Sequence, residues 1–227
     1  GQERLGQPGL VGRYLGDSIE VELLLSPYSR ERRLAEDRDR YRFSGLEFGR
    51  AQFEEGRWGL NLAGRLVHRG DDLEIGLSQF VGHSREPEFQ VLQRSGGRPP
   101  VLDLYYRRIV QSGVDAQLVI GHYVLRGEAL YRNGQSGGAF FAAAGGIERV
   151  FYGVRDSTAD LLAYAEAYWD GRDGSAPTTG FDNDVVIGGT LFMNDSVSSE
   201  FEGRVVIDVA SDAMLLDLSY RRRLSDS

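Results

Sequence analysis

The sequence predicts an all-β protein, an antiparallel up-and-down transmembrane β-barrel of about 10–12 strands. Three observations support this prediction. Apolar and polar residues alternate with period two in nearly every segment after Arg57, as the two faces of a strand require. Each segment runs about ten residues, the length that a tilted strand needs to cross a bilayer. The face opposite the apolar one carries charges of both signs in mid-strand.

We expect a single β-barrel domain over residues 1–227, with a first strand at 18–27, a charged loop at 28–56 and a regular hairpin ladder at 57–224. Residues 1–16 show little periodicity. In the first strand, Ile19, Val21 and Leu23 face one way and Glu20 and Glu22 the other. The loop that follows is crowded with charge (SRERRLAEDRDRYR) and is expected to be solvated, with some helix in it.

The hairpin ladder then continues in units of similar length. Asp160 to Asp170 (DLLAYAEAYWD) is its clearest strand, with leucine, alanines and Trp169 on one face and Glu166 on the other. The stretch 101–109 fits either a short strand or a helical turn, and 83–100 is expected to be a long polar loop. The remaining predicted strands are 57–66, 73–81, 114–121, 123–132, 140–152, 185–193, 201–209 and 214–220. Short and long connections alternate, except at the tight turn around Ser211 and Asp212, and consecutive hairpins disfavour a parallel sheet.

Composition narrows the possible functions. The 227 residues carry a formal net charge of −8, which argues against binding to nucleic acid. The chain has no cysteine, which excludes disulfides, thiolate catalysis and cysteine-based metal sites. The chain has no lysine, so arginine supplies its permanently charged cationic side chains. No run of about 18 apolar residues is present, so the sequence predicts no transmembrane helix.

A soluble β-sandwich or a lipocalin-like cup also has period-two strands, and both stay open as alternatives. The strand length and the mid-strand charges favour a membrane barrel. So do the aromatic residues near strand ends, because such residues form girdles at the membrane interface. They are Trp58, Tyr131, Phe151, Tyr152, Trp169 and Tyr220.

Several segments resemble an uncharacterised family of proteobacterial outer-membrane β-barrel proteins. They are SQFVGHSREPEF (Ser78–Phe89), LYYRRIVQSGVDAQLVIGHYVLRGEALYRNG (Leu104–Gly134), FFAAAGGIERVFYGVRDSTADLLAYAEAYWD (Phe140–Asp170) and FDNDVVIGGTLFMNDSVSSEF (Phe181–Phe201). The resemblance covers roughly Ser18 to the end and implies a bacterial outer-membrane location. Members of that family usually continue for at least one more strand pair and end in an aromatic residue. We therefore expect this chain to be incomplete at its C-terminus.

The charged face predicts the function. In a narrow barrel this face would line the lumen, where arginines and carboxylates pair. The expected lumen-lining residues are Arg65, Glu74, Asp115, Arg126, Glu128, Glu148, Glu166, Arg204, Asp208, Asp217 and Arg221. This pattern favours a small polar pore or passive transport component, with the lipid bilayer as its partner and small polar solutes or ions as its cargo. A structural barrel with a plugged lumen is the alternative, and the excess of acids favours cations in an open pore.

Other chemistry is weakly supported. His83, Ser84 and Glu86 lie close together in the sequence and would suit a lipid-modifying enzyme. Neighbouring side chains along an extended strand point apart, however, and a catalytic base must reach its nucleophile. We therefore expect no enzymatic activity and no catalytic residue. His68 and His122 lack the spacing of a zinc site. The acidic and amide residues at 182–184 and 194–195 are expected to form turns rather than bind calcium, and no metal or cofactor is predicted. The glycine pairs 145–146 and 188–189 are interpreted as bends or as room for a bulky side chain.

Overall fold

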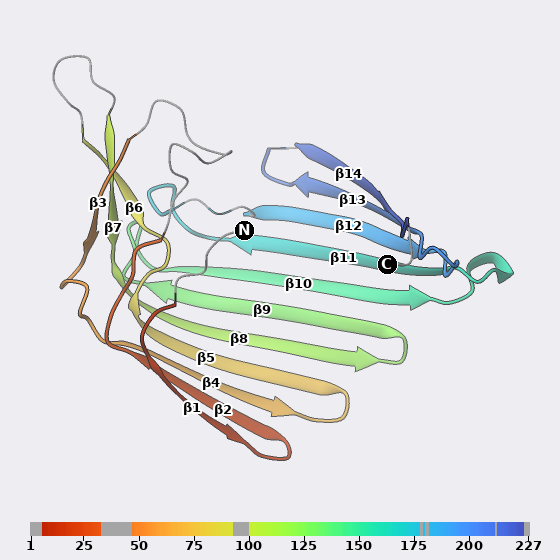
Figure 1. Cartoon of the computed structure of the whole chain (residues 1–227), viewed down its shortest axis with the longest axis horizontal. Coiled ribbons are helices and arrows are strands. Elements are labelled where there is room, and N and C mark those ends of the chain that lie inside the picture. The colour runs from red at the N-terminus through yellow and green to blue at the C-terminus, as the bar shows by residue number, and fades with distance from the viewer. Residues whose placement is uncertain are drawn as a thin grey trace.

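The computed structural model describes residues 6–32, 47–92, 100–177, 179, 182–211 and 213–224. The fold is all-β, as predicted. Eleven strands form one antiparallel meander sheet, and three more strands form a second, small sheet (Figure 1). Within the described part of the chain, the only helix is the 3₁₀ turn η1 (Val154–Asp156), and no helix has the length and apolar character to cross a membrane.

Each strand of the large sheet pairs with its neighbours in antiparallel register. In spatial order the strands are β1 (Leu10–Leu15), β2 (Ile19–Ser26), β4 (Asn61–Arg69), β5 (Leu73–His83), β8 (Arg108–Ile120), β9 (Tyr123–Asn133), β10 (Phe140–Phe151), β11 (Asp160–Asp170), β12 (Asn183–Phe192), β13 (Glu200–Asp208) and β14 (Met214–Arg221). The sheet curves strongly, and β1 and β14 are its edge strands (Figure 1).

The connections separate into two ends of the sheet. One end, which we call the turn end, joins β1–β2, β4–β5, β8–β9, β10–β11 and β12–β13. The other, which we call the loop end, holds β2–β4, β5–β8, β9–β10 and β11–β12. The predicted alternation of short and long connections is confirmed only in part, because the β9–β10 connection (134–139) is shorter than the β10–β11 (152–159) and β12–β13 (193–199) connections at the turn end. The β13–β14 connection is the short one at the loop end, also as predicted, although Asp212 within it lies outside the described residues.

The small sheet consists of β3 (Glu47–Phe53), β7 (Val101–Tyr106) and β6 (Glu88–Leu92). β6 and β7 pair in antiparallel register, and β3 pairs with β7 in parallel. Only Arg107 separates β7 from β8, and β6 follows β5 after residues 84–87. The β6–β7 hairpin is therefore a continuation of the β5–β8 hairpin beyond the large sheet. Figure 1 shows it standing at the loop end, steeply inclined to the long strands.

The structure differs from the sequence predictions at four places and decides between the two alternatives left open for residues 101–109. β1 lies in the stretch expected to lack periodicity, because both of its faces carry apolar residues around Gly12. β3 lies in the expected charged loop, and its parallel partner β7 is distant in sequence. β6 lies in the expected 83–100 loop, and residues 101–109 form β7 and the start of β8. The strand predicted from Arg57 begins only at Asn61. Residues 33–46, where some helix was expected, lie outside the described residues.

Several of the most buried apolar side chains lie in β7 and at the junction of the two sheets. They are Leu104, Tyr106, Ile109 and Phe140, with Val101 at the far end of β7, while Val67 and Val186 are similarly buried in the large sheet. The Tyr106 ring stacks on Phe53 of β3, with centroids 4.5 Å apart. The Tyr106 hydroxyl accepts a hydrogen bond from the backbone N–H of Arg32 (2.8 Å), and burial raises the pKa of this hydroxyl. This core fixes the small sheet onto the loop end.

Candidate functional site

The long strands give the large sheet one charged face and one apolar face. The register defines rows of side chains that cross neighbouring strands on the same face. One such row joins Asp115 of β8, Glu128 of β9, Ala144 of β10 and Tyr168 of β11. All eleven residues predicted to line a lumen fall on this charged face by the same register.

The opposite face carries aliphatic rows that stay open to the surroundings. Leu66, Leu77 and Val114 form part of one row. On β10, Ile147 is 43% exposed, whereas the side chain of the adjacent Glu148 on the charged face is 28% exposed. A soluble sheet normally covers its apolar face and leaves its charged face in water. Here the apolar face is not covered, and residues on it such as Leu77 (51% exposed) are as exposed as charged ones such as Arg65 (44%).

Aromatic residues mark both ends of the apolar face. At the loop end, Tyr131 lies against Phe141, with ring centroids 4.8 Å apart. At the turn end, Phe201 stacks on Tyr220 at 4.7 Å. Near the same end the Arg149 guanidinium lies over the rings of Tyr123 and Phe151 and donates to the Tyr123 hydroxyl (2.6 Å). Arg149, which interrupts the apolar face, is therefore held among aromatic rings.

Ion pairs satisfy many of the charges on the other face. Arg65 of β4 binds Asp115 across β5 at 2.8 Å. Arg204 and Asp217 pair at 2.8 Å, and Arg221 approaches Glu200 at 3.2 Å. Glu74 pairs with Arg69 at 2.9 Å. Asp208 instead accepts backbone hydrogen bonds from Ala210 (2.8 Å) and Ser211 (2.9 Å), so it closes a turn.

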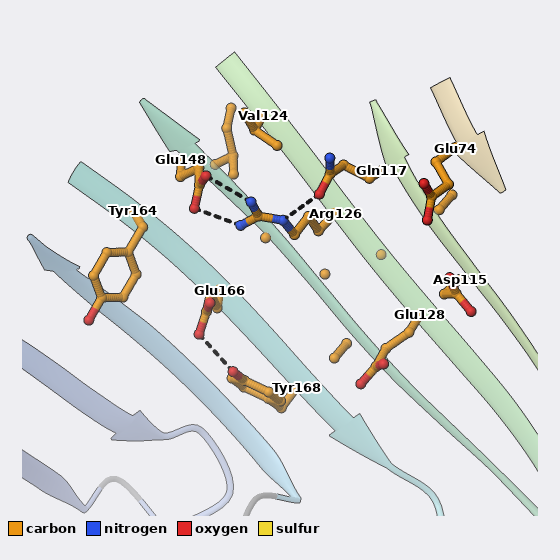
Figure 2. Close-up of a pocket in the computed structure, with 16 residues that line it drawn as sticks. Glu74, Asp115, Gln117, Val124, Arg126, Glu128, Glu148, Tyr164, Glu166 and Tyr168 are labelled. Atoms are coloured by element: carbon orange, nitrogen blue, oxygen red, sulfur yellow. Dashed lines mark hydrogen bonds and ion pairs between the residues drawn. The ribbon is translucent and has the colours of Figure 1, made fainter. Parts of the chain in front are cut away.

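A hollow of about 330 Å³ opens on this charged face, over β8 to β11 (Figure 2). Arg126 crosses it and donates to both oxygens of Glu148 (2.7 and 2.9 Å) and to Gln117 (2.9 Å). Glu166 accepts a hydrogen bond from the Tyr168 hydroxyl (2.7 Å). Glu128 forms no ion pair with any described residue, and no dashed line reaches it from the other lining residues in Figure 2. The lining therefore has more negative than positive charge.

Two glycines make room for these side chains. A Cβ at Gly76 would lie 2.6 Å from both Asp115 carboxylate oxygens and 2.8 Å from Arg65, so any larger residue would displace that ion pair. A Cβ at Gly188 would lie 2.6 Å from the Tyr164 ring. The interpretation of Gly188 as room for a bulky side chain is confirmed.

A second polar cluster lies where the charged face meets the small sheet. Glu86, in the β5–β6 connection, binds Arg132 at 2.8 Å and Arg172 at 3.5 Å. The two arginine side chains are only 11% and 13% exposed, and both guanidiniums lie near the Phe140 ring. Arg172 also pairs with Asp170 at 2.7 Å. The hydrogen bond from Arg172 to Asp170, with Glu86 adding to it, raises the pKa of the Arg172 guanidinium.

His83 belongs to a buried network that sequence reasoning missed. Its Nδ1 lies 2.8 Å from Ser29 Oγ, and its Nε2 lies 2.6 Å from the Glu54 carbonyl oxygen. The carbonyl can only accept, so Nε2 carries the proton and Nδ1 accepts from Ser29. Asn61 accepts from the His83 backbone N–H (2.7 Å) and donates to Ser29 (3.0 Å). No local pattern signals these contacts, because Ser29 and His83 are 54 positions apart.

This network bears on the enzyme alternative. The structure does not bring Ser84 to His83, since the Ser84 hydroxyl bonds to the backbone of Glu86 (3.1 Å). The serine that does contact His83, Ser29, is 4% exposed and His83 is 3% exposed. A nucleophile must reach its substrate. We therefore interpret this cluster as a structural anchor of the junction.

Of the candidate calcium ligands, Asp195 begins a turn, as predicted, whereas Asn183 and Asp184 lie in strand β12. Asp184 accepts from the backbone N–H of Asp182 (3.0 Å), and Asp195 accepts from that of Ser199 (2.8 Å). The Ser199 hydrogen bond lowers the pKa of the Asp195 carboxyl. Within the described ranges, no group of three or more histidine or acidic side chains is placed to hold a metal ion.

Comparisons with known proteins give no relative: no family model, no curated protein and no solved structure matches this chain.

Proposed function

We propose that this chain forms the wall of a transmembrane β-barrel in the bacterial outer membrane and works as a narrow polar pore for small solutes or ions. The main support is that the hollow and the ion pairs lie on one face of the curved sheet, and the exposed apolar rows lie on the other. In water this arrangement would leave a large apolar surface uncovered. Lipid acyl chains would cover it.

The dimensions of the apolar face agree with a bilayer. Phe141 and Phe151 stand at opposite ends of β10, about 33 Å apart for a rise of ~3.3 Å per residue. Strands of outer-membrane barrels tilt by about 35–45°, which reduces that length to about 25 Å along the membrane normal, close to the apolar band of such barrels. The aromatic residues at both ends would then lie at the two interfaces.

The same faces argue against a soluble ligand-binding barrel. A lipocalin-like cup places its apolar residues around the internal cavity. In this chain the residues with charged or hydroxyl-bearing side chains around the hollow include Glu74, Asp115, Arg126, Glu128, Glu148, Tyr164, Glu166 and Tyr168. Such a surface suits hydrated solutes rather than an apolar ligand. The sequence segments that resemble an outer-membrane family support the same proposed location, the bacterial outer membrane.

Closure of the sheet into a cylinder is part of the proposal. An open sheet edge in the hydrocarbon region would leave backbone groups unpaired, each at a cost of several kcal/mol. The edge strands β1 and β14 would therefore need partners within the bilayer. The charged side chains would then surround an aqueous lumen, where ion pairs and water solvate them.

Two measurements test this function. The full chain, refolded into detergent micelles, should migrate differently on gels before and after heating, as folded outer-membrane barrels do, and should require detergent to stay in solution. In a planar bilayer it should then produce discrete current steps. A chain that stays monodisperse in buffer without detergent would contradict the membrane location, and a folded, inserted protein without current would favour a plugged structural barrel.

A further inference from the structure

The start of the β6–β7 hairpin contacts the charged-face side of the large sheet. We call residues 84–92 and 100–107 the arm. The arm continues β5 and β8, yet its Glu86 contacts Arg132 of β9 and Arg172, which follows β11. In the sheet, β9 and β10 separate β8 from β11. A contact that bridges these strands requires the start of the arm to bend across the end of the sheet.

The wall residues that hold the arm belong to the charged face. Arg132 pairs in register with Gln111 and with Phe140, on the same face as the ion pairs. Two further contacts support the arm from the β9–β10 connection. Gln135 donates to the Glu86 carbonyl (3.4 Å), and the backbone N–H of Ser136 donates to Glu88 (2.9 Å). The arm thus lies across the inner side of the loop end, where a pore would have its mouth.

The Glu86 carboxylate can separate from Arg132 and Arg172 without disturbing the wall. The Glu86 side chain is 38% exposed, and its carboxylate lies between the guanidiniums of two largely buried arginine side chains. If Glu86 leaves, Arg132 keeps its hydrogen bonds to Gln111 (2.8 Å) and Gln135 (3.1 Å). Arg172 keeps its paired contacts with Asp170 (2.7 and 2.9 Å). The wall arginines therefore stay satisfied whether the arm is attached or not.

We propose that the arm is a strap that narrows the loop-end mouth of the pore, and that the Glu86 carboxylate holds it in place. This inference rests on the proposed pore function. After loss of the Glu86 charge, only the hydrogen bonds from Gln135 and Ser136, among the described residues, hold the first residues of the arm on the charged face, so these residues detach more often. The His83 network keeps the base of the arm attached to β4 and the β2–β4 connection. The mouth then widens, and the wall does not unfold.

The test compares Glu86→Gln with Glu31→Gln in the full refolded chain. Glu31 pairs with Arg57 at 2.9 Å, but this pair does not join the arm to the charged face. In Glu86→Gln, we expect amide hydrogen exchange in residues 84–92 to rise roughly tenfold, because the ion pairs of Glu86 with two largely buried arginines are lost. We also expect single-channel conductance to rise about twofold or more, because the constriction is relieved. Glu31→Gln should change neither.

The outcomes separate the two proposals. Faster exchange in Glu86→Gln with unchanged conductance would overturn the strap, since the arm would move without obstructing the path. Unchanged exchange would also overturn it, because Glu86 would not hold the arm. If neither the wild type nor Glu86→Gln conducts, the pore itself is wrong. Current from Glu86→Gln alone would support the strap as a closed mouth in the wild type.

Discussion

An arginine placed in the middle of the apolar face should be far more costly than one placed on the charged face. Ile147 lies on the apolar face of β10, between the aromatic residues at its two ends. Ala144 lies on the charged face of the same strand, lines the hollow and is paired in register with Glu128. The variants Ile147→Arg and Ala144→Arg therefore add the same charge at similar depth on opposite faces.

A lipid-covered apolar face and a water-covered one predict different losses in the free energy of unfolding. Arginine facing lipid near the bilayer midplane costs about 2–4 kcal/mol. In Ala144→Arg, the new guanidinium would face an aqueous lumen beside Glu128, and we expect a change within about 1 kcal/mol. If the apolar face were bathed in water instead, Ile147 at 43% exposure would tolerate arginine within about 0.5 kcal/mol.

The assay is reversible urea unfolding from phospholipid vesicles, followed by tryptophan fluorescence. The free energy of unfolding of each variant is compared with that of the wild type in the same lipid. A loss for Ile147→Arg that exceeds the loss for Ala144→Arg by about 2 kcal/mol or more is the expected result. Equal losses, or a larger loss for Ala144→Arg, would refute the assignment of the two faces.

Three further predictions concern the hollow and the junction. Glu128→Gln removes a carboxylate that forms no ion pair with a described cation. The reversal potential in a KCl gradient should therefore shift away from cation preference. An unchanged reversal potential would show that Glu128 does not face the conduction path. Asn61→Ala breaks buried hydrogen bonds to His83 and Ser29 and should lower the free energy of unfolding by about 2–3 kcal/mol. The control Asn133→Ala, at an exposed position, should lower it by about 0.5 kcal/mol or less. Similar losses in the two variants would contradict the anchor role. The raised pKa of Tyr106 stabilises the fold fully below the ordinary tyrosine value of about 10, and this contribution is lost as the pH rises toward the higher folded value. Stability measured between neutral and alkaline pH should therefore fall more in the wild type than in Tyr106→Phe, and parallel curves would contradict the effect of burial.

The long strands could be predicted because their information is local. β11 has the predicted bounds, Asp160–Asp170, and β9 and β10 agree with prediction to within one residue. In these strands each residue faces the opposite side from its neighbours, so the pattern of hydrophobicity alone defines the faces. The register then follows from short hairpin connections. For the same reason, the eleven charges predicted for one face do share it.

The junction could not be predicted because its contacts are distant in sequence. β3 pairs in parallel with β7, about fifty positions away, and its sequence EFGRAQF has no clean alternation. β6 follows Pro87 in a stretch dominated by polar residues, which favoured a loop. The pairing of His83 with Ser29 and the contact of Glu86 with Arg172 depend on how the arm bends. Only the three-dimensional arrangement brings these residues together.

The most direct test of the two-faced wall uses the protein's own tryptophans. The chain has two of them, and Trp169 lies on the apolar face, 51% exposed, near the loop end. In the variant Trp58→Phe, Trp169 is the single emitter. In vesicles whose lipids carry bromine on the acyl chain near the headgroup, the account predicts strong quenching of Trp169 and weak quenching by aqueous iodide. Free quenching by iodide with no response to brominated lipid would contradict it.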